Sequence, residues 1–139
     1  MTVETRHIEL ETTGNAEIVD ITGYITDELH QIGLTRGVVT VFVPGATGAL
    51  TTVEYEPGLI EDLGELWEKI IPSTKTYHHD RTWGDGNGHS HLRASLLGPS
   101  LAIPFADGDL TLGTWQQIIF VDFDVRARNR DIVLQFIGE

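Results

Sequence analysis

Two short runs of almost purely apolar, β-branched residues constrain the fold of this chain most strongly. Residues 37–44 read Gly-Val-Val-Thr-Val-Phe-Val-Pro, and residues 118–121 read Ile-Ile-Phe-Val. Such residues favour strands, and a run without polar alternation is typical of a strand covered on both faces. Both segments are therefore predicted to be central strands, each buried from two sides.

Further strands are expected around these two, separated by short turns. Alternation or local β-branched content predicts strands over 3–12, 17–21, 49–55, 100–104, 109–112, 114–123 and 132–137. The pair Asp107-Gly108 is a hairpin-turn signal between two of these segments. Hairpin-type connections indicate mostly antiparallel pairing.

Two segments carry helical patterns. Residues 22–32 place Ile25, Leu29 and Ile32 on one stripe, with Thr22 as the predicted N-cap. Residues 59–71 carry a longer apolar stripe and end at Pro72. A length of 139 residues fits one domain. The chain is therefore predicted to form a single α+β domain, 1–139, with two packed, mostly antiparallel sheets resembling a β-sandwich and two or three helices.

The polar stretch 77–99 is the main candidate for a functional site. It contains four of the six histidines (His78, His79, His89, His91) together with Asp80, Asp85, Asn87, Arg81 and Arg93. Imidazoles and carboxylates bind divalent metals, and a guanidinium matches the planar geometry of phosphate. A solvated surface loop is the competing interpretation.

Residues 88–97 can be interpreted in two ways. As a strand, His89 and His91 would lie on one face. As a helix, with Asn87 as N-cap and a stop at Gly98-Pro99, the two histidines would lie on different faces. The helix is favoured.

Charge and composition narrow the classes of partner. The formal net charge of −12 argues against nucleic acid, because phosphate backbones need clustered Lys and Arg. The one basic cluster, Arg126, Arg128 and Arg130, predicts either a local anion site or a solvated turn. The absence of cysteine, of a signal-peptide pattern and of a bilayer-length apolar run favours a cytoplasmic protein without a membrane partner.

Several motifs resemble the YjbQ-like family of small proteins, described as secondary thiamine-phosphate synthases. They are His79-Asp80, the run Gly-Asp-Gly-Asn-Gly-His-Ser-His ending at His91, Ser-Leu-Leu-Gly-Pro-Ser-Leu over 95–101 and Gly-Thr-Trp-Gln-Gln over 113–117. The arginine-rich segment near the C-terminus and Gly138-Glu139 also match, so the resemblance covers essentially the whole chain. It implies a β-sandwich-type α+β fold, a homotrimer and, often, a bound metal. Glu54 and the helix with Asp62 fall where the family carries acidic residues.

The chain departs from many bacterial members of that family at 45–49. Those members place His-Thr-Ser-Ala-Ser where this chain has Gly-Ala-Thr-Gly-Ala. A histidine is therefore missing here, and His89 is extra. Either the site has been rebuilt or that histidine is not essential.

His79 and His91 are the first predicted metal ligands. Glu54 or Asp80 would complete the shell, and His89 is the alternate. A nitrogen and oxygen shell without thiolate suits zinc first, with magnesium or manganese as alternatives. In the competing interpretation the histidines only form hydrogen bonds with carboxylates.

If the resemblance carries activity, a pyrimidine pyrophosphate loses pyrophosphate while the nitrogen of a thiazole phosphate attacks. Arg81, Arg93 and Thr47 are then the expected substrate contacts. The expected catalytic residues are Glu54, Asp80 and Ser95. Because a net charge of −12 suits two anionic substrates poorly, we expect this activity to be weak or secondary.

Two other functions remain open. One is a metal-dependent hydrolase or lyase of a small phosphorylated compound, with Glu54 or Asp80 as general base. The other is a non-catalytic trimer that binds a metal or a small molecule.

Overall fold

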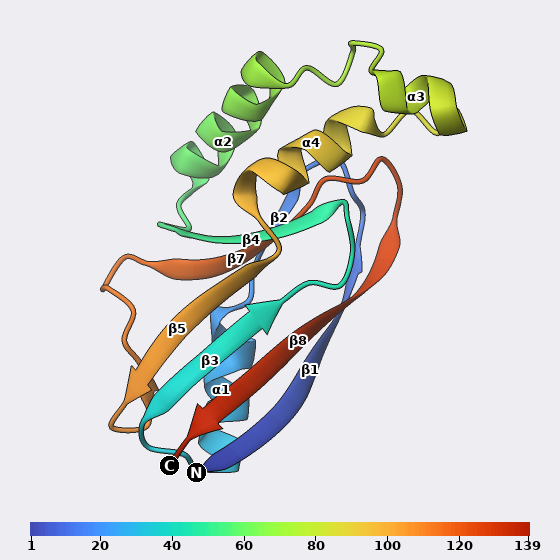
Figure 1. Ribbon diagram of the computed structural model, residues 1–139. Coiled ribbons are helices and arrows are strands. Elements are labelled where there is room, and N and C mark those ends of the chain that lie inside the picture. The colour runs from blue at the N-terminus through green and yellow to red at the C-terminus, as the bar shows by residue number, and fades with distance from the viewer.

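The computed structural model describes all residues, 1–139, as eight strands and four helices (Figure 1). The strands are β1 (Thr2–Thr12), β2 (Glu17–Asp20), β3 (Gly37–Phe42), β4 (Gly48–Val53), β5 (Ser100–Ala106), β6 (Asp109–Leu110), β7 (Gln117–Asp122) and β8 (Arg128–Gly138). The helices are α1 (Thr22–Ile32), α2 (Pro57–Ile70), α3 (His78–Trp83) and α4 (Gly88–Leu97).

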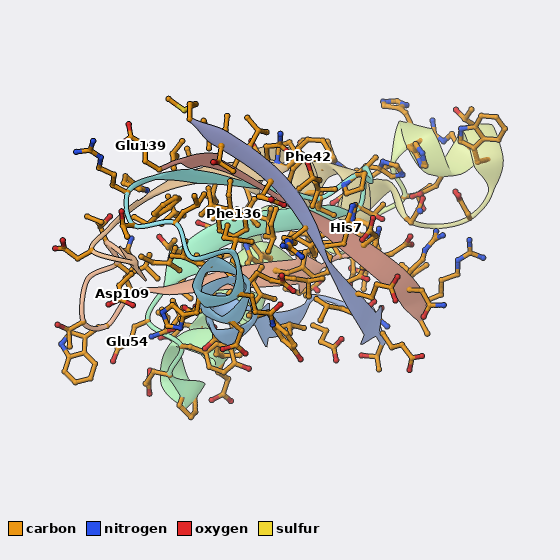
Figure 2. All side chains as sticks on the ribbon, turned by 90° about the horizontal axis from the view of Figure 1, so that it is seen from below. His7, Phe42, Glu54, Asp109, Phe136 and Glu139 are labelled. Atoms are coloured by element: carbon orange, nitrogen blue, oxygen red, sulfur yellow. The ribbon has the colours of Figure 1, made fainter.

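Five strands form the larger sheet, in the order β1-β8-β3-β5-β6, and every neighbouring pair is antiparallel. Side chains alternate along each strand, so Val39 and Val41 of β3 and Phe136 of β8 lie in the interior. Phe136 lies toward the interior and Phe42 on the outer side (Figure 2). Asp107, with a φ of 54°, begins the tight turn that was predicted between β5 and β6.

The smaller sheet has the order β2-β7-β4, with β7 at its centre. Every residue in the run 118–121 is fully buried, which confirms the prediction made from its apolar composition. Ile118 belongs to the core between the two sheets, whereas Ile119 belongs to a second core with Trp67 of α2 and Ala94 of α4. These two helices therefore cover the face of the small sheet that is turned away from the large one.

The layers confirm the predicted α+β, mostly antiparallel, two-sheet architecture. Two sheets face each other, α1 packs against β1, β6 and β7, and α2 and α4 lie across the small sheet (Figure 1). The short helix α3 is an addition to the two or three helices that were predicted. No helix has both the length and the apolar character needed to cross a membrane.

Several local predictions need adjustment. The strand predicted over 114–123 begins only at Gln117, and the strand predicted over 109–112 ends at Leu110. α1 has the predicted bounds, but Thr22 is not its N-cap: it is the first helical residue, and its Oγ1 accepts a hydrogen bond of 2.8 Å from the amide of Ile118. α2 begins at Pro57, before the predicted residue 59, because the carboxylate of Glu56 accepts the amide hydrogens of Gly58 and Leu59. Residues 88–97 form the favoured helix rather than the alternative strand.

The prediction that residues 37–44 are covered on both faces is wrong. No helix covers the outer face of the large sheet, which is turned toward the viewer in Figure 1, and 41 % of Phe42 is exposed. The strand register places Val38 beside both Ile137 and Pro104, and Ile137 beside Val3. We call the outer patch the uncharged surface formed by Val3, Val38, Thr40, Phe42, Pro104, Val133, Gln135 and Ile137.

Candidate functional site

A cleft of about 510 Å³ joins three parts of the chain that are far apart in sequence. They are the loop after β3, the segment that leads into α4, and the connection between β7 and β8 with the start of β8. The residues around it include Thr47, Asp85, Asn87, His91, Arg128 and Arg130. The cleft thus contains one of the predicted metal ligands, one of the predicted substrate contacts and two members of the basic cluster.

Asp122 and Arg130 form a buried ion pair beneath this cleft. The Asp122 side chain is fully buried and 9 % of the Arg130 side chain is exposed. Nε and Nη2 of Arg130 donate to the two carboxylate oxygens, each over 2.8 Å, and Thr12 donates its hydroxyl hydrogen to the same carboxylate. This bidentate geometry is the strong form of the arginine–carboxylate contact.

Asp124 holds the wall of the cleft together. It accepts hydrogen bonds from Arg128 Nε at 2.9 Å and from Thr47 Oγ1 at 3.1 Å, and Asn87 Nδ2 lies 3.3 Å from its Oδ1. Thr47 Oγ1 in turn accepts from Arg130 Nη2 at 2.8 Å. Thr47, a predicted substrate contact, is therefore buried inside this network and uses its hydroxyl there.

The network sets the ionisation of both aspartates. Burial by itself would raise the pKa of Asp124, but the amide of Val125 and the side chains of Arg128 and Asn87 outweigh it and lower the pKa to about 2. Burial likewise opposes ionisation of Asp122, and Arg130 and Thr12 still hold its pKa below the usual value. Both carboxylates are therefore ionised at neutral pH.

His79 and His91 lie against each other beside the cleft. Their ring centroids are 4.3 Å apart with an interplanar angle of 42°. Asp85 Oδ1 is 3.9 Å from His79 Nδ1, and that nitrogen is buried without a hydrogen-bond partner. Burial, and then the neighbouring His79, lower the pKa of His91, so its imidazole is neutral at pH 7. The structure thus brings the two first predicted metal ligands together.

Asp80 and His89 have other surroundings. The two carboxylate oxygens of Asp80 accept the amide hydrogens of Tyr77 and Gly88, each over 2.8 Å, so this residue ties the start of α3 to the start of α4. These amides lower the pKa of Asp80. His89 is buried and does not line the cleft, because a helix turns residues two positions apart to different faces.

The two predicted phosphate-binding arginines do not line the cleft. Arg93 is buried, and its Nε and Nη2 donate to the Ile71 carbonyl at 3.0 and 2.8 Å, while Nη2 also reaches Glu68 Oε2 at 3.0 Å. Its guanidinium therefore joins α4 to the end of α2. Arg81 is exposed on α3 and forms no ion pair.

Ser95 lies on the same face of α4 as His91 but uses its hydroxyl within the helix, whereas Glu54 is separated from the paired histidines. Ser95 donates its hydroxyl hydrogen to the carbonyl of Leu92, and it lines an adjoining hollow of about 470 Å³ that shares His91 with the cleft. Glu54 is exposed after the far end of β4, at the opposite end of the molecule from α3 (Figure 2). Six residues of extended chain from Gly48 correspond to roughly 20 Å. Glu54 is thus too remote to share a ligand shell with His91.

The protein side chains of this site could supply only part of the ligand shell of a metal ion. No three His, Asp or Glu side chains converge into a group that could hold a metal ion. His79 and His91 supply two nitrogen donors, and the unpartnered Nδ1 of His79 is one of them. Two protein ligands are one fewer than catalytic zinc sites use, so a divalent metal on this pair would need water or a bound compound for its remaining positions.

Sequence reasoning missed Asp122 and Asp124, and it assigned Asn87 a capping role that its side chain does not perform. Asn87 precedes α4 but makes no side-chain cap; it faces Asp124 instead. A signal for the aspartates was present, because they follow the apolar run 118–121 at alternate positions. Carboxylates inside such a run are buried only when they are paired, so a partner arginine could have been sought.

A family model described as "UPF0047 protein YjbQ-like" matches residues 6–139. A UPF0047 protein of Archaeoglobus fulgidus is 43 % identical over 91 % of this chain and 96 % of its own length. A UPF0047 protein of Methanothermobacter thermautotrophicus is 36 % identical over 100 % of this chain and 95 % of its own.

Solved structures show the same fold. A hypothetical protein from Aeropyrum pernix has a TM-score of 0.91 at 34 % identity, with 98 % of this chain and 99 % of the other covered. A YbjQ-like protein of unknown function from Sulfolobus solfataricus has a TM-score of 0.89 at 28 % identity, covering 99 % of this chain and 100 % of its own. The chain therefore has relatives that match it along nearly its whole length.

Proposed function

Because the chain belongs to the YjbQ-like UPF0047 family, we propose that it binds and acts on a small phosphorylated compound in the cleft beside His79 and His91. One observation carries the proposal: two imidazoles in contact lie next to a cleft whose wall contains two guanidinium groups, each paired with a buried aspartate. Imidazoles serve as metal ligands or proton acceptors, and guanidinium groups bind phosphate oxygens.

His91 is the proposed proton acceptor or metal ligand of this cleft. Its lowered pKa leaves a neutral imidazole at pH 7, which is the form that accepts a proton from a bound hydroxyl or amine. The ring of His79 lies against it.

We propose a divalent metal as the cofactor, zinc first and manganese or magnesium as alternatives. His79 and His91 would hold it, and its charge would neutralise phosphate oxygens and a departing pyrophosphate. The protein's own part is to orient the phosphorylated compound against the imidazole pair and to keep the cleft walls in place through Asp122 and Asp124.

The reaction we propose to test is a weak transfer of the thiamine-phosphate synthase type, in which a pyrimidine pyrophosphate is joined to a thiazole phosphate. The cleft volume of about 510 Å³ is within the usual range for a small-molecule site. This transfer asks mainly for two phosphates to be positioned and for the leaving group to be neutralised. A pure binding role would use the same residues without turnover.

The first experiment measures metal content and Mn²⁺ binding in the parent protein and in His79→Ala and His91→Ala. We expect both variants to lose metal while their thermal unfolding stays cooperative. His30→Ala is the matched control, because His30 is exposed on α1 and pairs with Asp109 of β6, and neither residue lines the cleft. Retention of metal by both variants would remove the imidazole pair from the proposal.

Turnover of the two thiamine precursors by the parent and its loss in His91→Ala would support the transfer.

We further propose that the protein assembles as a homotrimer through the outer patch. The patch contains no charged residue, although the chain carries a formal net charge of −12. Copies of one strongly acidic chain repel each other wherever carboxylates meet, so an uncharged, partly apolar sheet face is the surface at which they approach most easily.

A further inference from the structure

We propose that the Nη1 groups of Arg128 and Arg130 form the phosphate-binding part of the cleft, and that a phosphate binds there only together with a divalent cation. This inference rests on the proposed function and replaces the two arginines that the sequence suggested, neither of which lines the cleft. The ligand we propose is a compound with a phosphate or pyrophosphate group and a hydrogen-bond donor close to that group.

In each of the two guanidinium groups, Nε and Nη2 form hydrogen bonds within the protein and Nη1 is free. Nε and Nη2 of Arg130 are used by Asp122 and Thr47, and Nε and Nη2 of Arg128 are used by Asp124. The Nη1 group of each arginine has no protein hydrogen-bond partner, and both residues line the cleft. A guanidinium fixed by a carboxylate loses little side-chain freedom on binding a ligand, so its free end is preorganised.

Gly45 leaves the approach to Arg130 open. A Cβ atom at position 45 would lie 3.0 Å from Arg130 Nη1, which is the distance at which a phosphate oxygen would otherwise bind. Gly45 also lines the cleft. Any side chain at this position would therefore cover part of the free end of Arg130.

Asn87 indicates a second feature of the ligand. Only 5 % of this residue is exposed, and it lines the cleft. Its side-chain oxygen, Oδ1, has no hydrogen-bond partner. A buried acceptor without a partner is costly, and a ligand hydroxyl or amino group would satisfy it. The ligand class is therefore a phosphorylated compound with an O–H or N–H group close to the phosphate.

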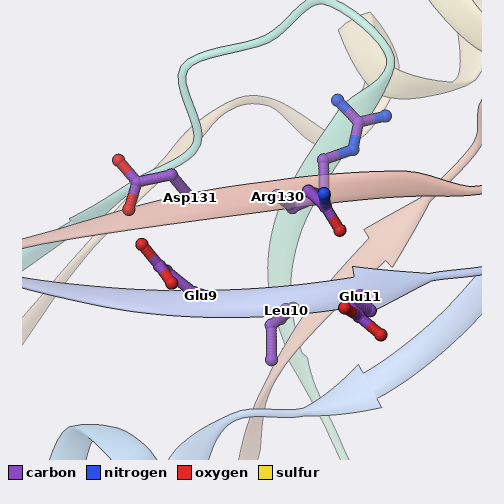
Figure 3. Close-up of a pocket in the computed structure, with 6 residues that line it drawn as sticks. Glu9, Leu10, Glu11, Arg130 and Asp131 are labelled. Atoms are coloured by element: carbon purple, nitrogen blue, oxygen red, sulfur yellow. The ribbon is translucent and has the colours of Figure 1, made fainter.

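The charges around the arginines explain why a cation is needed. Arg128 and Arg130 are each matched by a buried aspartate, so they add no net positive charge. A neighbouring hollow that Arg130 also borders is surrounded by the carboxylates of Glu9, Glu11 and Asp131 (Figure 3). A bare phosphate dianion would therefore be repelled, whereas a divalent ion on the imidazole pair would remove that repulsion.

The test measures binding of inorganic phosphate by isothermal titration calorimetry, with saturating Mn²⁺ and again with EDTA. The parent protein should bind phosphate with Mn²⁺ and not with EDTA. Gly45→Ala should weaken binding about tenfold or more, since its Cβ covers Arg130 Nη1. Arg128→Lys should weaken it too, because lysine keeps the charge beside Asp124 but lacks the planar fork. Gly23→Ala, which places a Cβ in open space on α1, should bind as the parent does.

The outcomes separate this inference from the proposed function. If the parent binds Mn²⁺ and phosphate, and both Gly45→Ala and Arg128→Lys bind phosphate as tightly as the parent, the arginine subsite is wrong and the histidine site stands. Equal phosphate binding in EDTA would overturn the requirement for a cation. If the parent binds neither Mn²⁺ nor phosphate, the proposed function itself fails. Cooperative unfolding of each variant, followed by circular dichroism, shows that a loss of binding is not a loss of fold.

Discussion

Asp124 shows how one residue connects the chemistry of this chain to its fold. Its carboxylate contacts Thr47, Asn87 and Arg128, which come from three separate segments, and all three line the cleft. Removal of that charge would leave these donors without an acceptor in a nearly dry environment. The residue therefore contributes to stability and to the shape of the cleft at once.

The lowered pKa of Asp124 predicts a pH dependence of stability. Because its folded-state pKa of about 2 is below its ordinary value of 3.8, the stabilisation is fully present above about pH 4 and is lost as the pH falls toward 2. The shift corresponds to about 2 kcal/mol. Urea unfolding of the parent and of Asp124→Asn between pH 7 and pH 2 should show two free energies of unfolding that converge at low pH. A constant difference would contradict the assignment; Asp107→Asn, in the exposed β5–β6 turn, is the control.

At the scale of elements, α4 positions the candidate site. Its first two turns carry His91 toward the cleft and Arg93 toward α2, and its start is joined to α3 through Asp80. The helix covers the small sheet through Ala94. Because Asp80 joins α3 to the start of α4, this contact keeps His79 in place relative to His91.

Asp80 is predicted to hold α3 in place rather than to act as a base. In Asp80→Ala the amides of Tyr77 and Gly88 lose their acceptor, so α3 should fray and His79 should leave His91. Hydrogen exchange followed by mass spectrometry should show faster exchange over α3 and the first turn of α4. Arg81→Ala, on the same short helix but without an ion pair, should exchange as the parent does. Unchanged exchange in Asp80→Ala would refute this role.

Arg93 is predicted to be a residue of helix packing. Arg93→Met keeps the aliphatic stem but leaves the Ile71 carbonyl and Glu68 without their donor, which should lower the free energy of unfolding by about 1–3 kcal/mol. Phosphate binding should not change. Urea unfolding and calorimetry test the two parts, with the exposed Lys69→Met of α2 as control. A loss of phosphate binding without a loss of stability would restore Arg93 as a ligand contact.

At the scale of the whole molecule, charge and exposed apolar surface are distributed unevenly. The outer patch is uncharged, while the edge of the same sheet near Glu9 and Asp131 places two carboxylates directly opposite each other. Like charges opposed in this way are destabilising, so copies should associate through the patch and not through that edge.

Ile137→Glu is predicted to abolish assembly, because it introduces a charge between Val3 and Val38, two apolar residues of the patch. Sedimentation velocity should show a parent particle of three times the 15.4 kDa chain mass and a monomeric variant. Leu96→Glu makes the same chemical change on the exposed side of α4 and should leave the assembly intact. A parent that sediments as a monomer, or a variant that still forms a trimer, would refute the proposed interface.

Sequence patterns predicted the architecture well, because the relevant signals are local. The apolar run 118–121, the stripe of 22–32 and the Asp107-Gly108 turn depend on residues close together in the chain, and the structure confirms each of them. The exposed face of β3 was not predicted, since β-branched residues favour a strand whether or not another layer covers it.

The candidate site, too, was predictable from the sequence only in part. From the sequence alone, residue types and motifs determined the family, the two-sheet α+β fold and the pairing of His79 with His91 as a candidate. Only the tertiary structure decided which charged groups meet. It directed Arg93 to α2, separated Glu54 from the histidines and joined Arg128 and Arg130 to Asp124 and Asp122. The reason is physical: strand and helix preferences act between near neighbours, whereas a buried charge is stable only beside a partner, and β-sheet pairing brings that partner from a distant segment.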